Sequence, residues 1–139
     1  MVYKKESLVK QIEKLKEYYR DIESYKDLPF EEYLADKRCK YAIERLFFLI
    51  SENILDFLDH LLSTRFSIVS EGYENILENS YKRGIIDKGV YQKLKGLGGF
   101  RNVLAYEYIG LDDKEVYRNF TKMKTILPEI IAYLENLVE

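Results

Sequence analysis

Apolar side chains recur at alternating four- and three-residue spacings along most of this chain, and this spacing constrains the fold more than any other feature. Between residues 5 and 26 the apolar positions are Leu8, Ile12, Leu15, Tyr19 and Ile22. A period near 3.6 residues places such side chains on one face of an α-helix, whereas a half-buried strand would alternate at every second residue. The spacing therefore predicts a first amphipathic helix over residues 5–26.

The same spacing predicts a long second helix and a shorter third one. Pro29 separates the first helix from the second, because proline lacks a backbone donor and clashes inside a helix. We expect the second helix over residues 30–63 and the third over residues 72–83, with Gly84 as a left-handed cap. The core stripe expected on the second helix comprises Cys39, Ile43, Leu46, Ile50, Ile54, Phe57 and Leu61, widened by Leu34, Phe47, Leu49 and Leu58.

Glycines interrupt the next helical segment, which is expected over residues 88–108 with Asp87 as its cap. Three glycines lie between residues 96 and 99. Each glycine weakens a helix by about 1 kcal/mol relative to alanine. We therefore expect a kink or a close backbone approach there, with firm helix resuming at Phe100. The Gly-Leu-Asp-Asp sequence at 110–113 ends this segment and caps a last helix that contains Pro128.

The low content of helix-breaking residues fits this pattern. Two prolines and seven glycines among 139 residues favour long helices over many short strands and turns. Apolar residues make up 47% of the chain, which is enough for a substantial core. The chain has no internal repeat and no long linker, so we expect one domain over residues 1–139. The sequence thus predicts an all-α, up-and-down bundle of four main helices and one short helix.

Composition excludes several classes of function. The net charge of −2 gives no general attraction to nucleic acids or acidic membranes. Cys39 is the only cysteine and His60 the only histidine, so the chain cannot form an internal disulfide or a site with two histidines. No run of about 18 apolar residues occurs, and the first residues lack the apolar core of a leader peptide. We therefore expect a cytoplasmic protein that does not span a membrane.

A basic segment precedes the last part of the fourth helical segment. Residues 82–101 carry six basic residues against one acidic residue, which is a local charge of +5. A solvated helix face explains such a segment more often than an RNA-binding surface does.

A polar cluster follows in the sequence GFRNVLAYEYIGLDD, residues 99–113. Arg101 and Tyr108 are seven residues apart, about two helical turns, so they share a face with Asn102. Asn102 and Tyr106 are four residues apart and are also neighbours on a helix. The planar guanidinium of Arg101 can bind a phosphate, with Asn102 fixing it or binding a second oxygen. The alternative is an Arg–Glu or Arg–Tyr contact that only ties helices together.

This cluster resembles the signature of the HEPN superfamily, and above all that of its HepT-like branch. That branch carries Arg-Asn-x-Leu-x-His-x-Tyr, which places Arg101, Asn102 and Tyr108 on three of its motif positions. The motif histidine falls on Tyr106. The long helix containing AIERLFFLISENILDFLDHLL, the acidic turn after the motif and the final amphipathic helix also resemble the family. The resemblance therefore covers nearly the whole chain and implies a HEPN-like bundle.

The resemblance implies a role in a toxin–antitoxin system. HepT-like proteins are metal-independent endoribonucleases that act as toxins, and they form homodimers in which the two motifs line one cleft. For this chain, that implies Arg101 and Asn102 at the RNA phosphate, Tyr106 at the third catalytic position, and no cofactor. It also implies a small MntA-like nucleotidyltransferase as partner. This partner neutralises the toxin, in known cases by adding AMP to the motif tyrosine, which here is Tyr108.

Tyr106 is the departure from the family pattern. RNA cleavage without a metal needs a group that transfers a proton near neutral pH, and a histidine with a pKa of about 6.5 suits this better than a tyrosine with a pKa of about 10. Loss of that transfer would slow cleavage by about 10²–10⁴-fold, so we expect a weakened or absent nuclease. Two origins stay open: Tyr106 is the natural residue of a binding form, or it is an inactivating substitution.

Three interpretations of the whole chain therefore remain. The first is a HepT-like toxin with impaired cleavage. The second is a catalytically silent module that binds a nucleotidyltransferase or a nucleotide, and the third is a helical dimerisation protein without a nucleotide role.

Other polar groups carry weaker signals. Asp56 and His60 lie four residues apart on the second helix, as in the HepT-like pattern. They either form an acid–histidine pair or make hydrogen bonds at the helix surface, and the second arrangement is the more common one. The carboxylates of Asp56, Asp59 and Glu107 lack any recognisable spacing of metal ligands, so we expect no metal site.

Overall fold

A computed structural model of the chain describes residues 4–106 and 110–138. All regular elements within these residues are α-helices, so the predicted all-α class is confirmed. The helices are α1 (Lys5–Glu23), α2 (Phe30–Ala35), α3 (Lys37–Phe66), α4 (Tyr73–Lys82), α5 (Lys88–Leu94), α6 (Leu97–Tyr106) and α7 (Asp113–Leu137).

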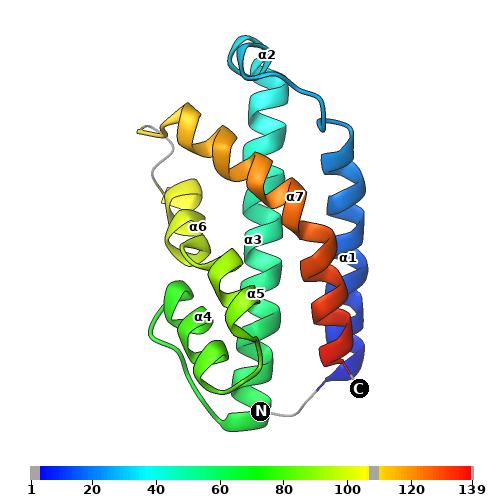
Figure 1. Cartoon of the computed structure of the whole chain (residues 1–139), viewed down its shortest axis with the longest axis vertical. Coiled ribbons are helices and arrows are strands. Elements are labelled where there is room, and N and C mark those ends of the chain that lie inside the picture. The colour runs from blue at the N-terminus through cyan, green and yellow to red at the C-terminus, as the bar shows by residue number, and fades with distance from the viewer. Residues whose placement is uncertain (1–3, 107–109, 139) are drawn as a thin grey trace.

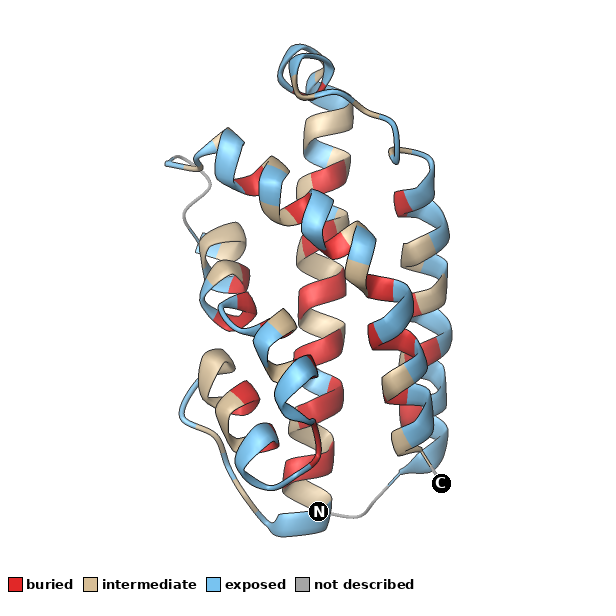
Figure 2. Ribbon diagram, viewed as in Figure 1, coloured by how far each residue is buried: buried red, intermediate tan, exposed pale blue. Residues whose placement is uncertain are grey.

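The long helix α3 runs through the middle of the bundle (Figure 1). Helices α1 and α7 pack against each other on one side of α3, and α4 and α6 pack against its other side. Buried residues follow α3 along most of its length (Figure 2), and they join those of α1, α4 and α7 in one apolar cluster. The motif helix α6 is therefore held between α3 and α4.

The core stripe predicted on α3 is largely confirmed. Five of its members are buried, namely Ile43, Ile50, Ile54, Phe57 and Leu61, together with Phe47 and Leu58 from the widened stripe. Cys39, Leu46 and Leu49 are half-buried. The apolar residues of α1 behave in the same way, because Leu8, Ile12, Leu15 and Ile22 are all buried.

The helix predicted over residues 30–63 is divided into α2 and α3 at Asp36. The backbone of Asp36 is extended (φ −102°, ψ 101°), and its Oδ1 accepts hydrogen bonds from the N–H of Arg38 at 2.9 Å and of Cys39 at 3.4 Å. This carboxylate satisfies donors that are unpaired at the start of a helix. Leu34 consequently lies on α2 and is 44% exposed, so its predicted place in the core stripe was wrong.

The predicted caps are confirmed. Gly84 has a left-handed backbone (φ 74°) after α4. Asp87 Oδ1 accepts from the N–H of Val90 at 2.8 Å at the start of α5. Asp112, within the predicted capping turn, accepts from the N–H of Lys114 at 3.0 Å at the start of α7.

The predicted break in the glycine-rich stretch is also confirmed. Gly96 has a left-handed backbone (φ 92°) and separates α5 from α6. The backbone N–H groups of Gly96 and Gly98 donate to the carboxylate of Glu74, at 2.9 and 3.0 Å. Glu74 lies on α4, so a side chain from another helix satisfies the first donors of α6. The motif helix therefore begins at Leu97, earlier than the predicted Phe100.

Gly98 allows α6 to approach the backbone of α4 closely. A Cβ atom added at this position would lie 2.3 Å from the backbone nitrogen of Glu74 and 2.5 Å from the carbonyl carbon of Tyr73. Neither backbone atom can move aside as a flexible side chain would. The absence of a side chain at Gly98 therefore sets the distance between α4 and α6.

We predict that Gly98→Ala destabilises the fold by about 1–3 kcal/mol, because the added methyl group overpacks this contact. Gly99→Ala is the matched control, since no atom lies within 4 Å of its added Cβ. It should gain up to about 1 kcal/mol from the better helix propensity of alanine. The measurement is the free energy of unfolding in urea, and equal stability of the two variants would contradict the packing account.

Candidate functional site

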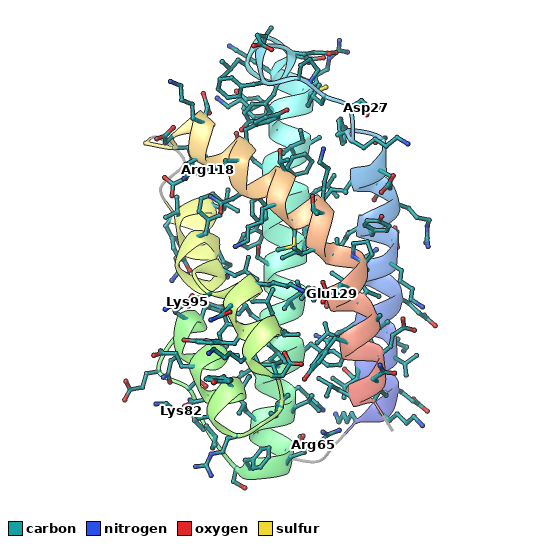
Figure 3. The ribbon with its side chains drawn as sticks, viewed as in Figure 1. Asp27, Arg65, Lys82, Lys95, Arg118 and Glu129 are labelled. Atoms are coloured by element: carbon teal, nitrogen blue, oxygen red, sulfur yellow. The ribbon has the colours of Figure 1, made fainter. Side chains whose placement is uncertain are left out.

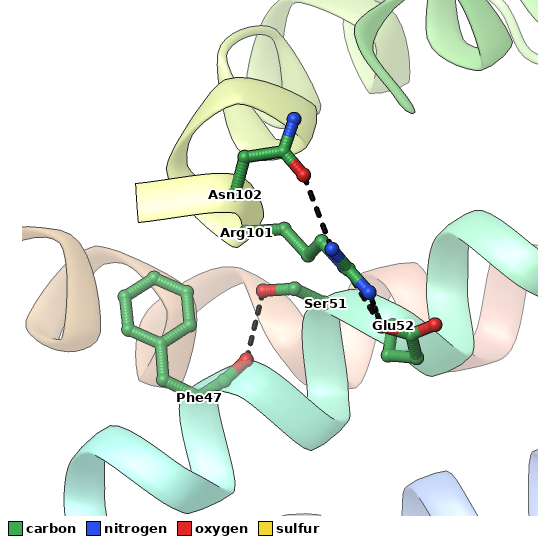
Figure 4. Close-up of polar contacts among 5 residues, drawn as sticks. All are labelled: Phe47, Ser51, Glu52, Arg101 and Asn102. Atoms are coloured by element: carbon green, nitrogen blue, oxygen red, sulfur yellow. Dashed lines mark hydrogen bonds and ion pairs between the residues drawn. The ribbon is translucent and has the colours of Figure 1, made fainter. Parts of the chain in front are cut away.

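Arg101 is a buried cation on α6, with only 7% of its surface exposed. Its Nε donates to Glu52 Oε2 at 2.8 Å, and its Nη2 lies 2.7 Å from the same oxygen. Its Nη1 donates to Asn102 Oδ1 at 3.1 Å (Figure 4). Glu52 lies on α3, so this ion pair joins the motif helix to the central helix.

Three aromatic rings surround the guanidinium of Arg101. Its central carbon lies 4.1 Å from the ring centre of Tyr73 on α4, 5.0 Å from that of Phe48 on α3, and 5.9 Å from that of Tyr106. A cation over the face of an aromatic ring is attracted by the ring's quadrupole, and more strongly when water is excluded. The rings and Glu52 together compensate the burial of this charge.

The ionisation of Arg101 follows from this enclosure. Burial lowers the pKa of its guanidinium, but hydrogen bonding to Glu52 and Tyr106 outweighs burial, and the pKa is raised. Burial and the charge of Glu52 raise the pKa of Tyr73, against an opposing effect of Arg101. At neutral pH the site therefore contains a permanent cation beside a protonated phenol, and Tyr73 cannot act as a base.

Asn102 and Tyr106 are the residues of the site that are exposed at the protein surface. Asn102 is exposed and Tyr106 is 73% exposed. Because Asn102 Oδ1 accepts from Arg101, its Nδ2 remains as a donor, and the amide nitrogen points away from Arg101 in Figure 4. Arg101 thus contacts both neighbours, through the hydrogen bond to Asn102 and through the ring of Tyr106. The predicted modification site, Tyr108, lies outside the described residues, as does Glu107.

Asp56 and His60 occupy the same helix as Glu52, further towards its end. His60 Nε2 accepts from the backbone N–H of Lys4 at 3.3 Å, which is a hydrogen bond at the protein surface. Burial and the charge of Lys4 lower the pKa of His60, and Asp59 partly offsets them. His60 lies eight residues beyond Glu52, about 12 Å along the helix axis, so it does not take the place of the motif histidine.

Asp56 lies one helical turn beyond Glu52 on α3 and is influenced by the charges of the site. Desolvation by the surrounding protein and the negative charges of Glu52 and Asp59 raise the pKa of Asp56 to about 6, while Arg101 acts in the opposite direction. Among residues 4–106 and 110–138, no group of three or more His, Cys, Asp or Glu side chains is placed to hold a metal ion.

The basic segment at residues 82–101 is divided between surface and interior. Lys82 and Lys95 are exposed (Figure 3), and the Nζ of Lys93 pairs with Glu129 on α7. Arg101 is the buried member of the segment. This division fits a solvated helix face and sets Arg101 apart from the other basic residues.

Sequence reasoning missed three residues of the site: Phe48, Glu52 and Tyr73. A signal for two of them was present, because Phe48 and Glu52 are four residues apart on one face of the long helix. That face borders the apolar stripe, so a helix packed against the stripe can meet both residues. Tyr73 had no such signal, since its contact depends on the turn before α4.

The fold and site define an all-α bundle with an Arg-Asn pair held against a glutamate of the central helix. A family model described as ribonuclease HepT-like matches residues 15–137. The chain therefore belongs to the ribonuclease HepT-like family. No curated protein matches the sequence. Within the described residues, no helix has the length and apolar character needed to cross a membrane.

We predict that Glu52→Ala destabilises the fold by about 3–5 kcal/mol, because the Arg101 charge stays buried without its anion. Glu17→Ala is the control, since it breaks the Lys14–Glu17 pair, whose side chains are 53% and 51% exposed. Loss of such a surface pair costs about 1 kcal/mol or less. Urea unfolding measures both, and similar losses would show that the buried pair contributes no more than a surface pair.

Proposed function

We propose that this chain is the toxin component of a HEPN-type toxin–antitoxin system, with an RNA-cleaving site built on Arg101 and Asn102. Membership of the ribonuclease HepT-like family supports the reaction class. The observation that carries the assignment of residues is the fixed cation at Arg101, whose partner Asn102 keeps an outward donor. In this proposal, RNA is the substrate and no metal takes part.

The roles of the two residues follow from their exposure. Asn102 donates from Nδ2 to a non-bridging phosphate oxygen, because its other amide atom is already engaged. Arg101 stabilises the added negative charge of the transition state through its field and through N–H groups beyond its contacts with Glu52. The ion pair with Glu52 keeps the guanidinium in one orientation, so no reorganisation is needed during the reaction.

Proton transfer is the weak step in this proposal. Tyr106 occupies the position of the motif histidine, and its exposed phenol can hydrogen-bond to RNA or stack on a base. A phenol with a pKa of about 10 is a poor base at neutral pH, so we propose that cleavage is slowed by about 10²–10⁴-fold.

Two copies of the chain form a homodimer in this proposal, and the exposed Tyr106 side chains line a shared cleft.

The partner is a small nucleotidyltransferase of the MntA type. Tyr108 is its proposed acceptor for AMP, since it stands at the motif tyrosine. The seven-residue spacing of Arg101 and Tyr108 predicts a shared helical face, on which an added phosphate would compete with RNA for the cation and would neutralise the toxin.

Tyr106 also favours a second candidate function. If Tyr106 abolishes proton transfer altogether, the chain is a catalytically silent module that binds the nucleotidyltransferase or a nucleotide. The fixed cation and the outward amide of Asn102 would then bind phosphate without cleaving it.

We predict that Tyr106→His increases metal-independent RNA cleavage by about 10²–10⁴-fold, because it restores a group that titrates near neutral pH. The assay uses labelled RNA in the presence of a chelator. Asn102→Ala in the same background should reduce cleavage without unfolding the chain, since Asn102 is exposed. Tyr81→His, at another exposed tyrosine, is the control and should gain nothing. No cleavage by Tyr106→His would reject the enzyme and leave the silent module.

We predict that incubation with an MntA-type nucleotidyltransferase, ATP and magnesium adds AMP to Tyr108. Intact-mass spectra measure the increment, and peptide spectra locate it. Tyr108→Phe should abolish the increment, whereas Tyr106→Phe should keep it. An unmodified chain beside a nucleotidyltransferase that is active in the same tube would reject this assignment.

A further inference from the structure

An open pocket lies beside the motif helix, on the side of Phe48 away from Glu52 along α3. Its volume is about 300 Å³. The lining residues come from one face of α3 and from the end of α6: Tyr41, Glu44, Arg45, Phe48, Leu104 and Ala105. Tyr106 follows Ala105 directly, so the pocket adjoins the exposed end of the proposed catalytic site.

A row of alternating cations and aromatic rings connects this pocket to the site. The guanidinium carbon of Arg45 lies 5.4 Å from the ring centre of Phe48, and that of Arg101 lies 5.0 Å from the same ring. The row continues to Tyr73, which lies 4.1 Å from Arg101. Arg101 is buried and Phe48 and Tyr73 are half-buried, so the row links the pocket to the site through the interior, and Arg45 is its member that faces solvent.

Tyr41 is the exposed aromatic surface of the pocket. It is 60% exposed, whereas most large apolar side chains of the described residues are buried. Tyr41 and Phe48 are seven residues apart on α3, so both rings lie on one face of the helix, with Arg45 between them. Aromatic rings and arginine side chains are the surfaces on which proteins stack unpaired bases, and Tyr41 is the exposed ring here.

The charges of the pocket favour a base over a phosphate inside it. Glu44 lines the pocket and would repel a phosphate group there. One of its carboxylate oxygens is buried without a hydrogen-bond partner, and burial raises the pKa of this carboxyl. Arg45 is exposed at the same pocket and is positioned to attract the phosphate that follows the base.

We propose that this pocket binds one unpaired nucleobase of a single-stranded RNA, stacked on Tyr41, while Arg45 binds the adjacent phosphate. This inference rests on the proposed function, because it assumes that the same RNA passes Asn102. It makes Tyr41 a substrate-positioning residue, and it implies that single-stranded RNA binds better than duplex RNA, whose bases cannot enter.

The test is the affinity of the full-length chain for a fluorescein-labelled single-stranded RNA, measured by fluorescence anisotropy at one stated salt concentration. Stacking on an aromatic side chain contributes about 1–3 kcal/mol, so Tyr41→Ala should weaken binding by about 5- to 150-fold. Tyr41→Phe, which keeps the ring, should stay within about twofold of the unsubstituted chain. Tyr81→Ala removes an exposed ring elsewhere and should leave the affinity unchanged.

An oligomer of abasic ribose phosphates separates stacking from charge. The unsubstituted chain and Tyr41→Ala should bind this oligomer equally, since it has no base to stack. Arg45→Ala should weaken binding of both oligomers and should reduce the dependence of affinity on salt.

The other possible results separate a failure of the base pocket from a failure of the proposed function. If Tyr41→Ala binds RNA as tightly as the unsubstituted chain while Asn102→Ala binds it less tightly, the base pocket is wrong and the proposed function stands. If Tyr41→Ala changes the sedimentation of the chain but not its RNA affinity, a second copy covers the pocket and the inference is overturned. If no form of the chain binds RNA, the proposed function and the inference both fail.

Discussion

The buried guanidinium of Arg101 is the contact on which the arrangement of the motif helix depends. A charge with so little access to water is stable only if an anion and polarisable rings replace the water. Glu52 from α3 and Tyr73 from α4 supply these groups. Displacing α6 from either neighbour would therefore leave a buried charge without compensation, and this cost holds the three helices together.

A second contact between α6 and α4 involves Gly98 and the carboxylate of Glu74. Gly98 lets α6 approach α4, and Glu74 of α4 satisfies the backbone donors at the start of α6. This approach brings the neighbouring residue, Tyr73, over Arg101. One short α4–α6 contact thus serves both helix capping and the enclosure of the cation, and it explains the glycine at position 98.

The division between buried and exposed groups bears on function. Arg101 is held inside, and the groups that can reach another molecule are its neighbours, Asn102 and Tyr106. Of the two interpretations that the sequence left open for Arg101, the contact that ties helices together is present as the ion pair with Glu52. Phosphate binding by Arg101 stays a prediction. No histidine lies beside Arg101, because His60 is the only histidine of the chain and accepts a hydrogen bond from Lys4, just before α1.

Helix positions were largely predictable because they depend on local properties. Apolar spacing located α1, α3 and α7, and capping residues such as Gly84 and Asp87 located helix ends, since a cap acts within a few residues. The split at Asp36 was not predicted. The apolar pattern continues across it, and only the side-chain bonds of Asp36 to the start of α3 distinguish a break from a continuous helix.

By itself, the sequence determined the all-α class and the stripes that form the core, because these follow from spacing along the chain. The motif positions Arg101, Asn102 and Tyr106 follow from the resemblance to the HepT-like signature. Only the tertiary structure decided which groups enclose Arg101. Glu52 is 49 residues away in the sequence, and its pairing with Arg101 depends on how α6 lies against α3. This pairing is favoured because a buried charge without a partner costs free energy, and that cost arises only once the helices have packed.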